Sequence, residues 1–171
     1  MDGEKGRRMG AQTNEAAELG FFDGETLLIR ALRRAAAGHE GCALTRRDFA
    51  IAFPGDADEV FVTFRAFLGT LAHGGRRKLR IALPGSALTM PDETLLIALL
   101  AAAQQGDDEL VDAYLCWLVR PGARASVAIT TRALATALAV HGYWLIATSA
   151  PHPPTLRAGP SLSPRAGRGP G

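Results

Sequence analysis

The stretch Leu95-Leu96-Ile97-Ala98-Leu99-Leu100-Ala101-Ala102-Ala103 decides the fold, because nine consecutive apolar residues leave a helix without a polar side. A helix-start signal around Pro91 precedes the stretch, and Gly106 follows it. A helix that is apolar on every side is buried in a protein core. A membrane span needs about 20 apolar residues, which is more than this stretch provides. We therefore predict a helix enclosed by the rest of the chain or by a second copy.

The composition is that of a helical globular protein. A chain of 171 residues fits one domain with tails. Alanine and leucine carry most of the apolar fraction of 47%, and tyrosine and tryptophan are scarce, which favours helices over sheets. Lys5 and Lys78 are the only lysines among 19 basic residues, and we attribute this arginine bias to a GC-rich bacterial genome.

Further helical patterns, each with start and stop signals, lie on both sides of the apolar stretch, in residues 23–38, 45–53, 57–73, 107–120 and 126–141. In the first of them, leucines form one stripe, and Arg30, Arg33 and Arg34 lie opposite. In the second, Thr45 to Asp48 reads as a capping box. The patterns predict a mostly α fold, a compact bundle of about five helices around the central apolar helix.

One segment has the pattern of a strand. Residues 76–83 alternate basic and apolar side chains before the turn at Pro84, and residues 143–147 are the other extended apolar segment. A lone strand leaves its backbone groups unpaired. We therefore expect these two segments to pair as a minor two-stranded β element.

The domain limits follow from composition. Residues 21–148 contain all of the predicted elements, so we expect a single helical domain there. Residues 1–20 are polar and glycine-rich, and residues 149–171 are rich in proline, glycine and arginine, so we predict that both segments are disordered. The tail holds three arginines and no acid, which leaves the remainder of the chain about neutral.

The densest charge in the chain is the basic cluster formed by Arg76, Arg77, Lys78 and Arg80. Such a cluster could contact an anion, an acidic partner or a nucleic-acid backbone. On a strand, however, three of these side chains would share the face opposite the apolar residues, as on any solvated sheet edge. We favour the solvated edge and keep the four residues as a possible anion or partner contact.

A helix-turn-helix arrangement is the alternative for nucleic-acid binding. Residues 46–53, a short turn and the helix 57–73 have suitable lengths. The second helix, however, begins with Asp56, Asp58 and Glu59, whose carboxylates would meet DNA phosphates. These acids suit the positive end of the helix dipole instead, so we expect nucleic-acid binding to be unlikely.

Catalytic and metal-binding patterns are weak in the sequence. His39 and Cys42 form one pair of zinc-ligand spacing, whereas a structural zinc site normally shows two. The sequence has no nucleophile elbow and no phosphate-binding loop. We expect no catalytic residue, cofactor or metal, and a small enzyme using His39, His73 or His141 is the third alternative.

These observations together predict a small bacterial protein that acts without catalysis, as a regulatory or adaptor module that binds an unknown protein partner. The two cysteines, and the lack of a secretory signal pattern before the first predicted helix, favour the cytoplasm. We expect no membrane association and a monomer or homodimer. The alternative is a helix-turn-helix-like nucleic-acid-binding regulator that uses the helices in residues 46–73 and the basic cluster from Arg76 to Arg80.

Overall fold

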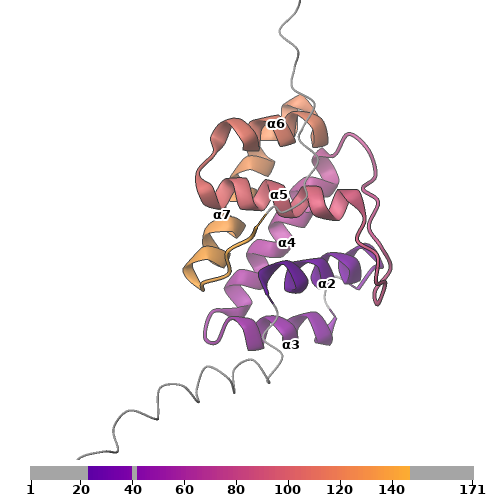
Figure 1. The fold of residues 1–171 in the computed structure, drawn as a ribbon, viewed down its shortest axis with the longest axis vertical. Helices are drawn as coiled ribbons and strands as arrows, with labels where there is room; N and C mark the ends of the chain where they lie inside the picture. The colour runs from indigo at the N-terminus through magenta and orange to yellow at the C-terminus, as the bar shows by residue number, and fades with distance from the viewer. Residues whose placement is uncertain (1–22, 40–41, 147–171) are drawn as a thin grey trace, which may run out of the picture.

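The computed structural model describes residues 23–39 and 42–146, which form a helical bundle (Figure 1). The α-helices are α2 (Gly24–Ala36), α3 (Ala43–Ala52), α4 (Ala57–Gly74), α5 (Pro91–Gln105), α6 (Asp108–Leu118) and α7 (Arg124–Val140), with a 3-10 turn at Pro121–Ala123. The predicted mostly α fold is thus confirmed. None of the helices in these ranges is both long and apolar enough to cross a membrane.

Helix α7 packs against both α4 and α5, and α6 covers another side of α5. Figure 1 shows α4 running diagonally through the molecule, from the side where α2 and α3 lie to the side where α6 lies. Close approach of α4 to the start of α7 depends on Gly74, where an added Cβ would lie 2.7 Å from the Cβ of Ala123. The same helix pair is joined by a hydrogen bond of 2.7 Å between the hydroxyls of Thr70 and Thr130.

The apolar stretch that begins at Leu95 forms the buried part of α5, as expected. Every residue from Leu95 to Ala102 is at most 3% exposed. The helix begins after Met90, whose amide donates to the carboxylate of Glu93 at 2.8 Å. It ends at Gly106, which adopts the left-handed conformation that glycine permits (φ +70°). The sequence signals at both ends of this helix therefore act as predicted.

The short helix α3 begins earlier than predicted. The capping box at Thr45 is wrong, because Cys42 is the N-cap and its sulfur accepts a hydrogen bond from the Thr45 amide. Thr45 lies inside the helix, where its side chain is buried. Phe49 of this helix then packs on Phe61 and Phe64 of α4, with ring centroids 5.5 and 5.4 Å apart.

The predicted two-stranded β element is absent from the described residues. Residues 76–83 and 143–146 have no regular secondary structure, and Ala147 lies outside the described ranges. The physical reason is that side chains satisfy their backbone amides: Asp92 accepts from the amide of Arg80, and Gln104 accepts from that of Leu145. The bridge that does form in the described ranges is an isolated antiparallel one between Gly75 and Val119.

The predicted domain of residues 21–148 has its ends outside the described residues. The predicted disordered segments, 1–20 and 149–171, also lie outside them. The domain limits therefore stay a prediction.

Candidate functional site

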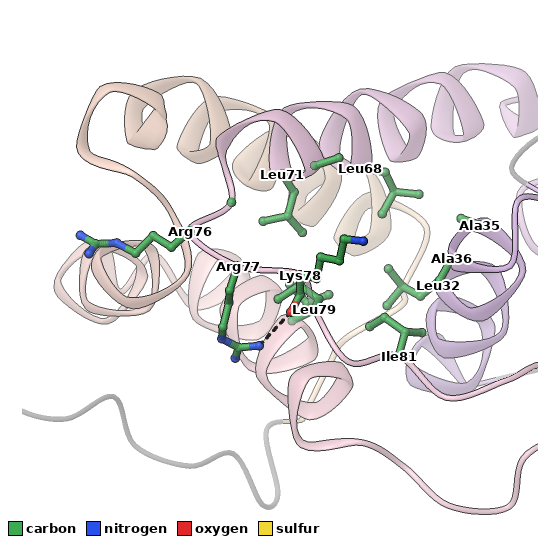
Figure 2. Close-up of a pocket in the computed structure, with 13 residues that line it drawn as sticks. Leu32, Ala35, Ala36, Leu68, Leu71, Arg76, Arg77, Lys78, Leu79 and Ile81 are labelled. Atoms are coloured by element: carbon green, nitrogen blue, oxygen red, sulfur yellow. Dashed lines mark hydrogen bonds between the residues drawn. The ribbon is translucent and has the colours of Figure 1, made fainter.

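The basic cluster lies on the long loop between α4 and α5, which runs from Gly75 to Met90. Its first member, Arg76, is fixed to the end of α6: its amide donates to the carbonyl of Leu118 at 2.9 Å, and its Nε donates to that of Val119 at 3.0 Å. Figure 2 shows the Arg76 side chain pointing away from the rest of the cluster. Arg76 therefore serves to attach the loop to α6.

Arg77 is held by an acid at the start of α5. Its two terminal nitrogens donate to the two carboxylate oxygens of Asp92 at 2.6 and 2.7 Å. The hydrogen bonds from Arg77 lower the pKa of Asp92, and the bond from the Arg80 amide lowers it further. Burial acts in the opposite direction, but the pKa of Asp92 stays below its ordinary value. The charge of Arg77 is thus neutralised within the protein.

The side chains of Lys78 and Arg80 have neither a carbonyl anchor like that of Arg76 nor an ion-pair partner in the described part of the chain. Figure 2 shows Lys78 extending between leucines of α4 and Leu79 of the loop. The four predicted contact residues therefore do not act as one patch, because two of them hold the loop in place. A hollow beside the loop is lined by Arg76, Arg77 and Lys78, and of these three Lys78 has neither kind of bond within the described ranges.

That hollow is an apolar groove of about 560 Å³. One side consists of α2 and the other of α4, and residues 75–79 and Ile81 of the loop close one end. The helical lining residues are Leu32, Ala35, Ala36, Leu68, Leu71, Ala72 and Leu96. Pockets that bind ligands commonly enclose roughly 300–1,000 Å³ and have mostly apolar walls with few polar groups. The groove is therefore of a size and chemistry suited to apolar groups of a ligand.

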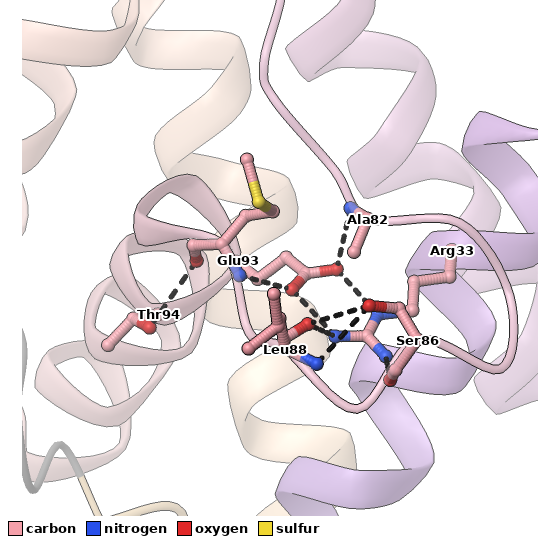
Figure 3. Close-up of polar contacts among 7 residues, drawn as sticks. Arg33, Ala82, Ser86, Leu88, Glu93 and Thr94 are labelled. Atoms are coloured by element: carbon pink, nitrogen blue, oxygen red, sulfur yellow. Dashed lines mark hydrogen bonds and ion pairs between the residues drawn. The ribbon is translucent and has the colours of Figure 1, made fainter.

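A buried ion pair holds the loop beside the groove (Figure 3). Arg33 of α2 donates to both oxygens of Glu93 at 2.7 and 2.9 Å, and also to the carbonyls of Ser86 and Leu88. Glu93 in turn accepts from the amide of Ala82 at 3.2 Å. Burial raises the pKa of Glu93. The hydrogen bonds from Arg33 and from the amides of Met90 and Ala82 outweigh burial, so the pKa of Glu93 lies below its ordinary value.

Sequence reasoning placed Arg33 on the polar face of its helix, which is wrong. The side chain is 8% exposed because it lies next to the leucine stripe and points toward α5. The usable signal was the pair of adjacent acids at the start of the apolar helix. Helices α4 and α6 also begin with adjacent acids, and those acids are exposed, so this signal alone does not identify a buried ion pair.

No family model, curated protein or solved structure matches this chain.

The histidines weighed for catalysis lie on separate parts of the fold. His39 is exposed after α2, and His73 is exposed near the end of α4, where its Nδ1 lies 2.8 Å from the carbonyl of Gly69. His141 follows α7, 3.6 Å from the carboxylate of Asp56 and against the ring of Phe53. Within residues 23–39 and 42–146 no group of three His, Cys, Asp or Glu could hold a metal ion.

The two helices of the nucleic-acid alternative, α3 and α4, do pack together. The first turn of α4 exposes Asp58 and Glu59, however, and Arg46 of α3 lies 3.4 Å from Asp58. A recognition helix presents its first turns to the bases, and here those turns are acidic. Among the described residues, no contact favours DNA binding by α3 and α4 over ligand binding in the groove between α2 and α4.

Proposed function

We propose that this protein is a non-enzymatic adaptor or regulatory module that binds a segment of a partner protein in the groove between α2 and α4. The observation that carries the proposal is the groove itself, an apolar hollow of about 560 Å³ with the ammonium of Lys78 at its edge. Apolar side chains of a partner would fill it, and a polar group beside them would meet Lys78.

The groove has fixed walls, which supports a binding role. Leu32 and Leu71 are each 4% exposed and anchor α2 and α4 in the core. The loop is tied to α5 through Arg77 and to α2 through the Arg33–Glu93 pair. A hollow that exists before the partner arrives spares the cost of ordering it on binding.

We place this binding in the bacterial cytoplasm as part of the same proposal. Cys42 and Cys116 are both unpaired thiols, as is usual in a reducing compartment. The protein would act as a monomer or homodimer. It would need neither a cofactor nor a nucleic acid.

Differential capture from a lysate of the source organism tests the proposal. Ala36→Trp puts a large ring at an exposed position in the groove, and Ala50→Trp makes the same change at an exposed position on α3. We expect the wild type and Ala50→Trp to capture a common protein that Ala36→Trp loses by at least tenfold. The captured protein must then bind the wild type when both are purified.

Three results would overturn the proposal. The first is capture of the same proteins by the wild type and both variants, which would place binding outside the groove. The second is the absence of any protein above the empty resin. The third is retention of the wild type on a nucleic-acid column, which would favour the helix-turn-helix alternative.

A further inference from the structure

The groove continues along the outer side of α4 as a second hollow. This hollow, of about 480 Å³, is open to solvent because all of its lining residues belong to α4, and it begins at Val62, a side chain that is 65% exposed. Leu68 and Ala72 line both hollows, so the two adjoin. Together they extend along α4 from Val62 to His73 and then to the loop at Lys78.

The length of this combined groove matches a short helix. The part on α4 spans roughly 16 Å at 1.5 Å per residue, or about three helical turns. Ala66, Gly69 and Ala72 form part of its floor, so a second helix could approach α4 closely. Amphipathic helices bind such grooves through apolar side chains that recur at each turn.

The charge of the groove selects the kind of helix. No carboxylate lines either hollow, whereas Arg65, His73 and Lys78 lie along them. In the described part of the chain neither Arg65 nor Lys78 has an ion-pair partner. The acids of α4 are confined to its first turn, at Asp58 and Glu59. The full chain carries a net charge of only +2, so this local excess of positive charge is not a general property of the protein.

We propose that the occupant of the combined groove is an acidic amphipathic helix of the partner. This inference rests on the proposed function and names the chemistry of the partner's segment. Apolar side chains one turn apart would enter the two hollows. Carboxylates beside them would meet Lys78 at one end and Arg65 at the other, which favours acidic helices and excludes basic ones by repulsion.

Two synthetic helices that differ only in charge test the inference with the full-length protein. Each peptide is about four turns long, carries a fluorophore and places leucines at i, i+3, i+4 and i+7; the polar positions are glutamate in one and lysine in the other. Fluorescence anisotropy measures the Kd of each. We expect the glutamate peptide to bind at least tenfold more tightly, and added salt to weaken it.

Charge variants of the protein locate the binding. Lys78→Glu should weaken the glutamate peptide at least tenfold, and Lys78→Met should weaken it less. Arg47→Glu makes the same charge change at an exposed position on α3, outside both hollows, and should leave the Kd within about twofold. Amide NMR shifts caused by the peptide should be concentrated around Leu68, Ala72 and Lys78.

The inference is overturned if neither peptide binds, if both bind equally, or if Lys78→Glu leaves the Kd of the glutamate peptide unchanged. A concentration-dependent dimer that Ala36→Trp abolishes would put a second copy in the groove and would also overturn it. If Ala36→Trp still abolishes partner capture in these cases, the adaptor function stands and only the acidic helix is wrong. If it does not, both proposals fail.

Discussion

The guanidinium of Arg33 and the carboxylate of Glu93 form a two-bond ion pair in the interior, although the residues are 60 positions apart in the chain. Their side chains are 8% and 0% exposed. Through them, α2, α5 and the loop between α4 and α5 share one polar contact. Removing one partner of such a pair leaves a buried charge without compensation, whereas removing both does not.

The first prediction concerns this pair. Arg33→Met should lower the free energy of unfolding by about 3–5 kcal/mol, because Glu93 keeps its burial and loses its cation. The double variant Arg33→Met/Glu93→Met should be more stable than the sum of the two single effects predicts. Urea unfolding followed by circular dichroism measures both. Arg47→Met, at an exposed site on α3, is the control and should change stability by less than about 0.5 kcal/mol.

The second prediction is a loss of stability in acid. The folded-state pKa values of Asp92 and Glu93 lie below their ordinary values. A depressed carboxyl pKa contributes stability that is fully present above the unfolded-state pKa, near 4, and is lost as the pH falls through the folded-state pKa. The free energy of unfolding should therefore fall below about pH 4. Asp92→Asn should reduce that slope, whereas Asp112→Asn, at an exposed carboxylate on α6, should retain it. Equal slopes in the wild type and Asp92→Asn would contradict the prediction.

The third prediction tests the apolar helix. Leu99 is fully buried in α5, so Leu99→Ala should lower the free energy of unfolding by about 2–5 kcal/mol. Leu99→Asp should unfold the protein, because it buries a charge without a partner. Ile129→Asp on α7, where the side chain is 68% exposed, should leave the fold intact. A folded Leu99→Asp protein with an altered oligomeric state, seen by size-exclusion chromatography, would make this helix an interface.

The fourth prediction compares two glycines of α4. Gly74→Ala should be destabilising by about 1–3 kcal/mol, because its Cβ would lie 2.7 Å from the Cβ of Ala123. Gly69→Ala should be stabilising by about 0.5–1 kcal/mol, because an added Cβ meets nothing within 4 Å and alanine favours a helix interior. Thermal unfolding distinguishes the two signs. Stabilisation by both substitutions would mean that helix α7 does not approach α4 as described.

The fifth prediction concerns the segment after α7. Gln104 donates to the carbonyl of Tyr143 at 2.8 Å and accepts from the amide of Leu145 at 2.8 Å. Gln104→Met removes both bonds, and also the longer one of 3.3 Å from Gln104 to the carbonyl of Ala135, with little change in volume. Hydrogen exchange at the Leu145 amide should accelerate, while exchange in α4 and α5 stays slow. Gln105→Met, at the exposed neighbouring position, should leave exchange at Leu145 as it is in the wild type.

The helices could be predicted from the sequence because their start and stop signals are local. Asp23 and Asp107 accept from the amides of Thr26 and Leu110 at 2.7 and 2.9 Å, as caps predicted from their residue types do. The burial of the apolar stretch could also be predicted without knowing which helices pack against it. The capping box at Thr45 failed because Cys42, a less usual cap, took that position.

The loop and the groove could not be predicted, because they depend on contacts between distant segments. The alternation in residues 79–83 resembles a strand, but the carboxylates of Asp92 and Glu93 accept from the amides of Arg80 and Ala82, which a pairing strand would otherwise use. Only a fold that brings α2, α4 and the loop together creates the groove. The basic cluster could be found in the sequence from its density of positive charge. Which member forms an ion pair depends on the position of Asp92, which binds Arg77.

Arg77 and Lys78 are consecutive residues, and their placement links the groove to the core. Arg77 is bound to the first turn of α5, and Lys78 reaches over the groove. A molecule that binds the folded protein and not the unfolded chain shifts the unfolding equilibrium by mass action. Any occupant held by Lys78 therefore also favours the ordered loop and the start of the apolar helix. A rise in the thermal unfolding temperature of the isolated protein is consequently a direct assay for such occupants, whatever their identity.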